Sequence, residues 1–137
     1  MHIILTVDDN WGMSFNHRRQ SRDRVLSKRI LELSSPAYLW INEASQNLFT
    51  DAPIHLIVDN DFASKADAGD YCFVENADFF PTMEKIEDII VFHWNRMYPS
   101  DQVFDQNILT TAWILTSTSE FMGHSHEKIT DERYVRR

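Results

Sequence analysis

The sequence contains very little cysteine and glycine. Among its 137 residues the only cysteine is Cys72, so an intrachain disulfide and a zinc site built from several thiolates are both excluded. A reducing compartment fits this composition best, and we expect a cytoplasmic protein. Glycine occurs only at Gly12, Gly69 and Gly123. A chain so poor in glycine has few places where its backbone can approach a phosphate group closely.

Long hydrophobic runs and an excess of positive charge are missing as well. No apolar run approaches the ~20 residues that a membrane span requires, and no basic, apolar and cleavage segments typical of a signal peptide follow Met1. The net charge of −8 argues against a general nucleic-acid coat, which needs a basic surface. With 43% hydrophobic and 25% charged residues, the chain is typical of a soluble globular protein, and its length predicts one domain over residues 1–137.

Short apolar runs alternate with helical or polar stretches over the first two thirds of the chain. Strands are predicted at residues 2–7, 36–42, 54–58, 71–74 and 89–92, and helical segments at 23–33, 43–49 and 62–69. Strands separated by helices indicate parallel crossovers, and therefore a mainly parallel sheet covered on both faces. Residues 113–121 and 127–135 have no helix between them, which predicts an antiparallel hairpin at the sheet edge. The fold class is thus α/β, a single-domain mixed sheet with flanking helices and a C-terminal antiparallel hairpin.

The stretch between the first strand and the first helix is the best candidate for a site. Residues 10–22 read as a loop that includes Gly12, the bulky apolar Met13 and Phe15, and a cluster of arginines, Arg18, Arg19 and Arg22. The arginines could form a fork of donors for a phosphate or carboxylate. Alternatively, the loop is solvated and its arginines pair with Asp8, Asp9 or Asp23.

Asp23 opens the first helix, where a carboxylate is favoured by unpaired backbone N–H groups. The loop 10–22 is expected to close over the end of the first strand, with Asp23 beneath it and residues 94–96 beside it. A carboxylate walled by apolar side chains would lose water, so its pKa is expected above the ordinary value unless an arginine pairs with it.

The order of these elements resembles the dihydrofolate reductase fold. Trp11-Gly12-Met13 resembles the mobile loop over that enzyme's active site, and residues 21–24 (Ser-Arg-Asp-Arg) resemble the start of the helix that presents its catalytic acid. The resemblance places Asp23 at the acid position. Near the end of the chain, residues 89–104 are similar to the family's strand and loop that finish with an Asp and a Phe, here Asp101 and Phe104.

Two departures from the family argue against the family's cofactor. Where the family has a Gly-Arg-x-Thr motif that grips the cofactor phosphate, this chain has residues 42–45 (Asn-Glu-Ala-Ser). Where the family has a Gly-Gly pair before a cofactor-binding helix, residues 79–89 contain no glycine. We therefore expect no bound cofactor, a shortened fold without that helix, and no NADPH-dependent reduction of dihydrofolate. Three further stretches, residues 18–21, 94–99 and 125–130, resemble a small family of bacterial proteins, and this likeness implies no mechanism.

The histidines near the C-terminus offer a second kind of chemistry. His124 and His126 are two residues apart, so on a strand they would share one face and could ligate a metal, although this is a weak signal. A metal-free nuclease or hydrolase could instead use His126 and Glu127 with Arg18 and Arg96. The alternative is a surface turn before the last strand, with no catalytic or metal-binding role.

Our leading hypothesis from the sequence is a small-molecule-binding or regulatory protein. Trp11 and Trp94 follow strand ends and could stack on a planar ring, while Asp23 and the arginines would bind ring nitrogens and an anion. The ligand-binding residues predicted for a nucleotide- or pterin-like molecule are Trp11, Met13, Arg18, Arg19, Asp23, Trp94 and Arg96. The alternatives are an enzyme of unassigned reaction, including the small nuclease, and an interaction protein that inhibits a host defence.

Overall fold

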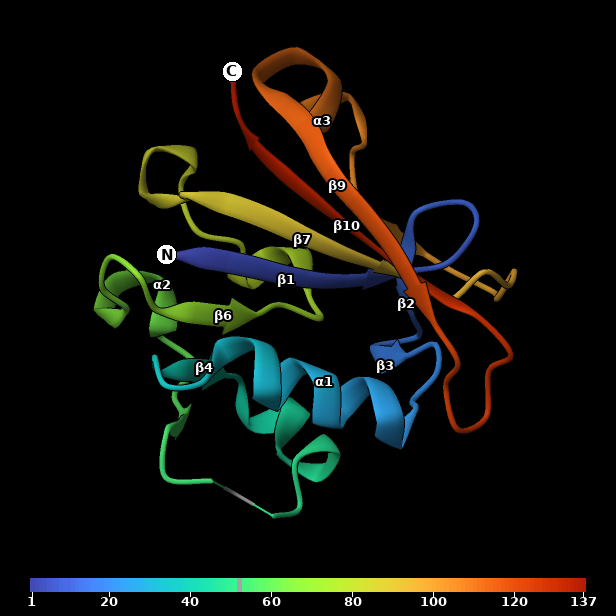
Figure 1. Ribbon diagram of the computed structural model, residues 1–137, viewed down its shortest axis with the longest axis horizontal. Helices are drawn as coiled ribbons and strands as arrows, with labels where there is room; N and C mark the ends of the chain where they lie inside the picture. Colours follow the sequence, from blue (N-terminus) through green and yellow to red (C-terminus); the bar gives the residue numbers. More distant parts are fainter. Residues whose placement is uncertain (52) are drawn as a thin grey trace.

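A seven-stranded mixed sheet forms the centre of the computed structural model, which describes residues 1–51 and 53–137 (Figure 1). The strand order is β5-β4-β6-β1-β7-β10-β9, in which the first five strands run parallel and β10 is antiparallel to both of its neighbours. The strands are β1 (His2–Val7), β4 (Leu39–Ile41), β5 (Leu56–Val58), β6 (Tyr71–Phe73), β7 (Asp88–His93), β9 (Trp113–Phe121) and β10 (Ile129–Arg136). The predicted α/β class, with its mainly parallel sheet and C-terminal hairpin, is confirmed.

Strand β1 lies in the middle of the sheet and is buried on both faces. It pairs in parallel with β6, where His2 is opposite Tyr71, and with β7, where His2 is opposite Asp88. An apolar, β-branched run suits this position because parallel strands covered on both faces have no solvent side. The carboxyl ends of β4, β6, β1 and β7 therefore open on one edge of the sheet, the usual ligand side of an α/β fold.

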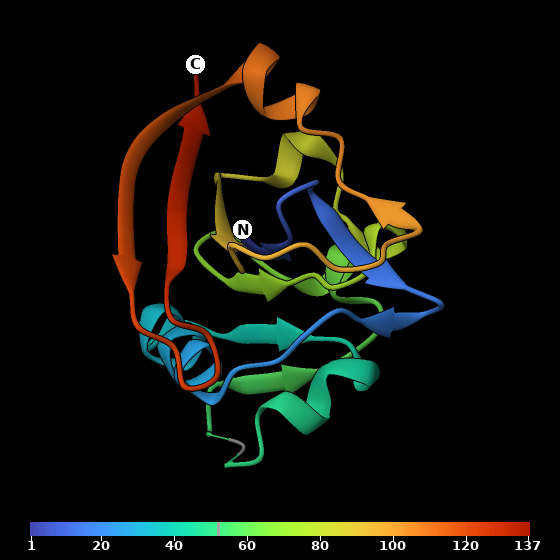
Figure 2. The same cartoon turned by 90° about the vertical axis from the view of Figure 1, so that its right-hand side faces the viewer.

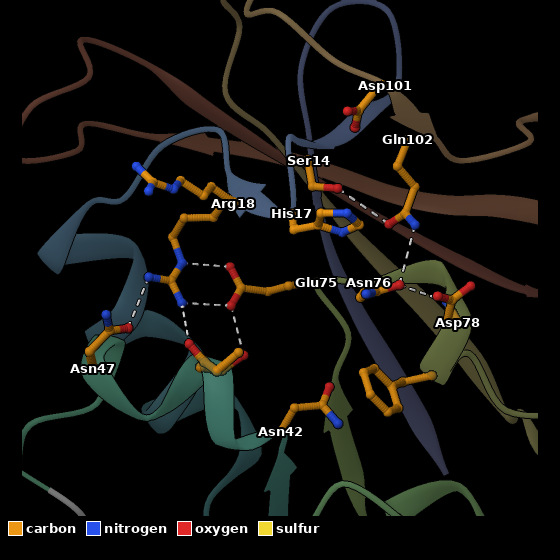
Figure 3. Close-up of a pocket in the computed structure, with 14 residues that line it drawn as sticks. Ser14, His17, Arg18, Asn42, Asn47, Glu75, Asn76, Asp78, Asp101 and Gln102 are labelled. Atoms are coloured by element: carbon orange, nitrogen blue, oxygen red, sulfur yellow. Dashed lines mark hydrogen bonds and ion pairs between the residues drawn. The ribbon is translucent and has the colours of Figure 1, made fainter.

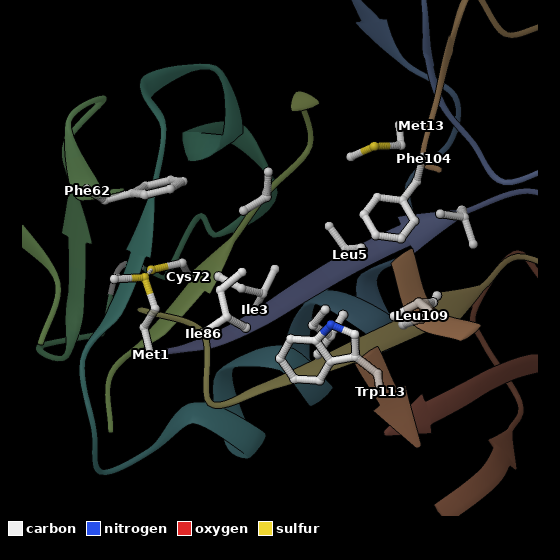
Figure 4. Close-up of a cluster of buried hydrophobic side chains, with 14 residues drawn as sticks. Met1, Ile3, Leu5, Met13, Phe62, Cys72, Ile86, Phe104, Leu109 and Trp113 are labelled. Carbon is white, nitrogen blue, oxygen red and sulfur yellow. Dashed lines mark hydrogen bonds between the residues drawn. The ribbon is translucent and has the colours of Figure 1, made fainter. Parts of the chain in front are cut away.

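Two hydrophobic cores cover the two faces of the sheet. On one face, Ile3 and Leu5 of β1 pack in a cluster with Trp113, Phe62 and Cys72 (Figure 4). On the other face lies helix α1 (Arg24–Ser34), whose Leu26 and Ile30 are buried against the sheet (Figures 1 and 2). The alternation of β1 side chains between these clusters is the period-two pattern of a strand. Burial of this kind contributes about 25 cal/mol per Å² of apolar surface.

A second, three-stranded sheet replaces the loop that the sequence predicted over residues 10–22. Its order is β3-β2-β8, made of β2 (Gly12–Phe15), β3 (Arg18–Arg19) and β8 (Gln102–Val103). The two residues between β2 and β3, Asn16 and His17, both have positive φ (51° and 62°), as two-residue hairpin turns require. The prediction of an irregular loop is therefore wrong in its detail. Arg18 and Arg19 lie on a paired strand, and Arg22 follows it outside the strand.

The remaining helical segments are short. They are the 3₁₀ helices η1 (Glu43–Leu48), η2 (Ala77–Phe79) and η3 (Met83–Lys85), and the α-helices α2 (Phe62–Lys65) and α3 (Asn107–Ala112). Helix α3 was not predicted, and the helix predicted over 43–49 is a 3₁₀ helix. The connection from β6 to β7 carries only η2 and η3. No helix within residues 1–51 or 53–137 has the length and apolar character needed to cross a membrane.

The C-terminal hairpin leaves β9 at the sheet edge. Strands β9 and β10 pair in register from Ile129 opposite Phe121 to Arg136 opposite Trp113, with an irregularity between Arg133 and Tyr134. The turn that joins them, residues 122–128, lies beside the N-terminal end of α1 in both views (Figures 1 and 2). This placement brings the last part of the chain onto Asp23.

Candidate functional site

Asp23 is fully engaged by hydrogen bonds inside the protein. Its carboxylate caps α1 by accepting from the backbone N–H groups of Val25 (2.9 Å) and Leu26 (3.2 Å). The same carboxylate accepts from the backbone N–H groups of His124 (3.0 Å) and Ser125 (2.8 Å) and interacts with Nδ1 of His126 (3.0 Å). Asp23 therefore fastens the β9–β10 turn to the start of α1.

This network decides the ionisation of Asp23. Burial on its own raises the pKa, but the hydrogen bonds from His124, Ser125, His126 and Leu26 together hold the pKa of Asp23 well below its usual range. The prediction of a raised pKa is wrong, because the strongest compensating hydrogen bonds come from the backbone N–H groups of His124 and Ser125, about one hundred residues away in sequence. The cavity beside Asp23 has a volume of only about 10 Å³, room for one water molecule and not for a planar ring.

His126 belongs to this turn, and its side chain points inward with both ring nitrogens in contact with polar groups. Its side chain is buried beside Asp23, while its Nε2 lies 3.1 Å from Ser21 Oγ and 3.0 Å from Tyr98 Oη. His124 is exposed in the same turn, so the two histidines do not share a strand face as a metal pair would require. Among the residues that the structure describes, no cluster of three or more His, Cys, Asp or Glu side chains is arranged to hold a metal ion.

The other residues predicted for the site are dispersed. Trp94 is buried and packs against the His126 ring with 4.6 Å between centroids, and Met13 is buried in the core on the opposite face of the sheet. Trp11 is half-buried between His93 and Phe104. These side chains serve as packing groups, so none of the three forms an open stacking face. Arg96 is exposed and donates to the backbone oxygen of Ser125, and Glu127 is exposed in the turn.

The expected meeting of the two loops at the end of β1 is confirmed, and Asp8 is the residue that holds them. Its buried carboxylate accepts from the backbone N–H groups of Asn10 (2.9 Å), Gly12 (2.7 Å) and Tyr98 (3.1 Å) and from Nε2 of Gln20 (3.1 Å). A carboxylate with several N–H donors is a strong local anchor. Asp8 thus positions the β2–β3 hairpin over the carboxyl edge of the sheet.

Beneath that hairpin lies a cavity of about 750 Å³, which we call the amide cavity (Figure 3). Its lining is rich in asparagine and glutamine and comes from the hairpin, the ends of β4 and β6, η1, η2 and β8. It is lined by Ser14, His17, Arg18, Arg19, Asn42, Ala44, Ser45, Asn47, Glu75, Asn76, Asp78, Phe79, Asp101 and Gln102. Of the predicted binding residues, the structure brings Arg18 and Arg19 to this cavity and leaves the others outside its lining.

Arg19 and Glu75 form the best-ordered part of the cavity wall. Nε of Arg19 donates to Oε2 of Glu75 at 2.8 Å and Nη2 donates to Oε1 at 2.9 Å, a bidentate pair. Arg19 also donates to Asn47 Oδ1 (2.9 Å) and to the backbone oxygen of Ala44 (2.8 Å), and Ser45 Oγ donates to Glu75 (2.7 Å). Arg19 is therefore paired internally, as the alternative from the sequence proposed, but with Glu75 and not with Asp8, Asp9 or Asp23.

Asn42 contributes an unsatisfied donor to the same cavity. Its side chain is only 4% exposed, yet its Nδ2 has no hydrogen-bond partner in the described part of the chain. In Figure 3 the Asn42 side chain lies on the floor of the cavity below Glu75. Since an unpaired buried N–H group costs about 1–3 kcal/mol, such a group suggests a partner that the chain alone does not supply. Arg18, on the opposite rim, is exposed and forms no ion pair with a described residue.

The residues of the amide cavity do not fit the pyrophosphate of a nicotinamide dinucleotide. Residues 74–87, which join β6 to β7, contain no glycine through which the backbone could approach a phosphate closely. Glu75 presents a carboxylate at this point, and η2 is a three-residue 3₁₀ helix without the N-terminal turns that bind a phosphate.

Comparison with known proteins identifies the architecture. No family model and no curated protein sequence matches the chain. Among solved structures, it is similar to dihydrofolate reductase from Enterococcus faecalis complexed with NADP(H) and RAB-propyl, with a TM-score of 0.68 and 11% sequence identity over 99% of this chain and 95% of that one. The geometry agrees with the resemblance predicted from Asp23 and the element order. The chain has a dihydrofolate reductase-like fold.

Proposed function

We propose that the protein binds a planar, polar small molecule of the nucleotide or pterin class in the amide cavity, and that it acts as a binding or regulatory protein. The observation that carries this proposal is the buried, unpartnered Nδ2 of Asn42 on the floor of a 750 Å³ cavity. Ligand sites are typically clefts of about 300–1,000 Å³ with a few placed polar groups. The cavity lies at the carboxyl edge of the sheet, where α/β folds place ligands.

The chemistry of the lining defines the ligand further. Nδ2 of Asn42 requires an acceptor, such as a ring nitrogen or a ring carbonyl oxygen. The half-buried ring of Phe79 offers a face for stacking, and the exposed guanidinium of Arg18 offers a site for one anionic group at the rim. Nucleosides, nucleoside monophosphates and pterins combine these features, and the solved reductase that resembles this chain holds NADP(H).

We also propose that the chain does not reduce dihydrofolate with NADPH. Glu75 and the short η2 oppose binding of the dinucleotide pyrophosphate, as described above. In addition, the β9–β10 turn covers Asp23, and the remaining space beside its carboxylate is about 10 Å³. A substrate ring that needs this carboxylate would have to displace the turn, together with the hydrogen bonds that His124, Ser125 and His126 donate to Asp23.

A thermal-shift screen with nucleotides, pterins and flavins tests the binding proposal. A ligand of the amide cavity should stabilise the wild type and Asp23→Asn, because Asp23 lies outside the cavity, but should stabilise Asn42→Ala much less. Asn107→Ala, which changes an exposed asparagine on α3, is the matched control and should respond as the wild type does.

The same screen has outcomes that would refute the proposal. A ligand that stabilises Asn42→Ala as strongly as the wild type but fails with Asp23→Asn would place the site at Asp23. A complete absence of hits at millimolar concentrations would refute a nucleotide- or pterin-like ligand altogether.

A further inference from the structure

Three residues outside the amide cavity, Ser21, His126 and Asp23, form a hydrogen-bonded array. Ser21 Oγ lies 3.1 Å from Nε2 of His126, and Nδ1 of His126 lies 3.0 Å from Oδ2 of Asp23. A hydroxyl, an imidazole and a carboxylate in this order and at these distances are the arrangement that activates a serine nucleophile. We propose that Ser21 is a nucleophile for small carboxylic esters, with His126 as its general base and Asp23 as the residue that positions His126. This inference concerns a different site and does not depend on ligand binding in the amide cavity.

The protonation states in this array follow from the hydrogen bonds. Asp23 accepts four backbone N–H groups, so its carboxylate is ionised and can only accept from His126. The proton of the neutral imidazole is therefore on Nδ1, and the lone pair of Nε2 faces Ser21. An imidazole locked in this tautomer can remove the hydroxyl proton from Ser21. Holding the imidazole in this tautomer is the role that the carboxylate performs in serine hydrolases.

Tyr98 completes the array on the side away from Asp23. Its hydroxyl lies 3.3 Å from Ser21 Oγ and 3.0 Å from Nε2 of His126. A phenol in this position can donate to Ser21 while Ser21 donates to His126. When a carbonyl group is attacked by Ser21, the same phenol is within reach of the oxygen that becomes negatively charged.

The surroundings of Ser21 restrict the substrate to a small acyl group. Ser21 is half-buried, and it lines the small cavity of about 10 Å³ together with Leu26, Phe73 and Trp94. This space suits a methyl group. Tyr98 also lines an open crevice of about 320 Å³, formed with Phe15 and Gln20 among others, which has room for the alcohol part of an ester. The expected substrates are therefore acetyl esters.

The proposed reaction is a two-step ester hydrolysis. Ser21 Oγ attacks the carbonyl carbon while its proton moves to Nε2 of His126, and the tetrahedral oxyanion accepts a hydrogen bond from Tyr98. The C–O bond to the alcohol then breaks, and the departing oxygen takes the proton from His126, which leaves acetyl-Ser21. A water molecule next attacks the acyl carbon, one of its protons passes through His126 to Ser21 Oγ, and acetic acid is released with the other. The balance is ester plus water giving acid plus alcohol.

Covalent labelling followed by mass spectrometry tests this proposal. Methanesulfonyl fluoride reacts with activated serines by losing fluoride and carries only a methyl group on the reacting sulfur, so the folded wild type should gain one methanesulfonyl group, located by peptide mapping on Ser21. Hydrolysis of p-nitrophenyl acetate, followed by p-nitrophenol release, measures the reaction itself. Ser21→Ala should abolish both signals, whereas Ser117→Ala, a change of an exposed serine on β9, should leave both unchanged.

Two further variants distinguish a nucleophile from a purely structural serine. Asp23→Asn keeps a side-chain acceptor for α1 but no longer fixes the imidazole tautomer, so labelling of Ser21 should slow by on the order of 10³-fold or more in protein shown to be folded by circular dichroism. Tyr98→Phe should reduce ester hydrolysis by on the order of 10²-fold through loss of an oxyanion donor. Since Tyr98 is half-buried, this variant remains informative if Asp23→Asn does not fold.

The proposal fails under any of three results. The first is an absence of label on Ser21 in folded wild type, and the second is a label that is distributed over exposed serines such as Ser117. The third is an ester hydrolysis rate that Ser21→Ala leaves unchanged.

Discussion

Replacing Asp23 by alanine should destabilise the protein far more than the loss of an ordinary helix cap does. The carboxylate accepts from the N–H groups of Val25 and Leu26 at the start of α1, and from those of His124 and Ser125 in the β9–β10 turn. Alanine removes all of these acceptors at once. It also leaves Nδ1 of His126, whose side chain is buried, without its carboxylate partner.

The expected loss of unfolding free energy has two contributions, one from the donors at the start of α1 and one from the donors in the β9–β10 turn. Loss of an N-cap side chain costs about 1 kcal/mol. The donors of the turn are not part of the cap, and leaving buried donors unpaired adds about 1–3 kcal/mol for each group that water does not reach. With one or two such donors left without water, at about 2 kcal/mol each, the free energy of unfolding should fall by about 3–5 kcal/mol. This is a large fraction of the ~5–15 kcal/mol by which domains are typically stable.

Urea denaturation followed by tryptophan fluorescence measures this change. With a slope of about 1–3 kcal/mol per molar urea for a protein of this size, the midpoint should fall by roughly 1 M or more. Asp61→Ala is the matched control, because Asp61 precedes α2 without a side-chain cap hydrogen bond, and its effect should stay within about 0.5 kcal/mol. A loss of only about 1 kcal/mol for Asp23→Ala would refute the reasoning, since it would mean that Asp23 acts as a helix cap alone.

Acid should reproduce part of this loss. The pKa of Asp23 in the folded protein lies below its ordinary value of 3.8. A depressed carboxyl pKa contributes stability that is fully present above the unfolded value and is lost as the pH falls through the folded value. Unfolding free energies of the wild type and Asp23→Ala should therefore differ most above about pH 4 and converge as the pH decreases below it. A difference that stays constant down to pH 2 would contradict this.

Three other predictions concern residues away from Asp23. Burial raises the pKa of Cys72 to about 12, so its thiol should not react with Ellman's reagent at pH 8 until urea unfolds the chain, when one thiol per chain should react. Burial and the neighbouring Glu132 raise the pKa of Tyr134 to about 12, so Tyr134→Phe should remove the last phenolate step in an absorbance titration at 295 nm. The pure protein should not oxidise NADPH in the presence of dihydrofolate; steady oxidation, lost in Asp23→Asn, would overturn that expectation.

The regular elements could be predicted because their sequence patterns match the burial they acquire. Residues 2–7 are apolar and β-branched, and in the structure they form a strand buried on both faces. The β2–β3 hairpin was missed because its two turn residues with positive φ are Asn16 and His17, and histidine there gives no turn signal as glycine would. Helix α3 was missed because its sequence, Asn-Ile-Leu-Thr-Thr-Ala, contains weak helix formers.

Only those features of the candidate site that depend on neighbouring residues could be predicted from the sequence. Local sequence identified Asp23 as a helix cap and the arginines as a cluster, because both are features of neighbouring residues. The partners of these groups come from far along the chain: Glu75 pairs with Arg19 from 56 residues away, and Ser125 reaches Asp23 from 102 residues away. A single sequence contains no signal for such pairings. For this reason the pKa of Asp23 and the location of the amide cavity became clear only in three dimensions.

The central position of β1 has a consequence for how the protein is made. The strand occupies residues 2–7, yet its neighbours begin at Tyr71 and Asp88. A ribosome adds about 5–20 residues per second, so this apolar segment leaves the exit tunnel on the order of ten seconds before β7 does. During that interval the strand exposes both of its faces and both of its edges. Chaperones that bind nascent apolar segments at the ribosome should therefore improve the folding yield more than chaperones that act after chain release.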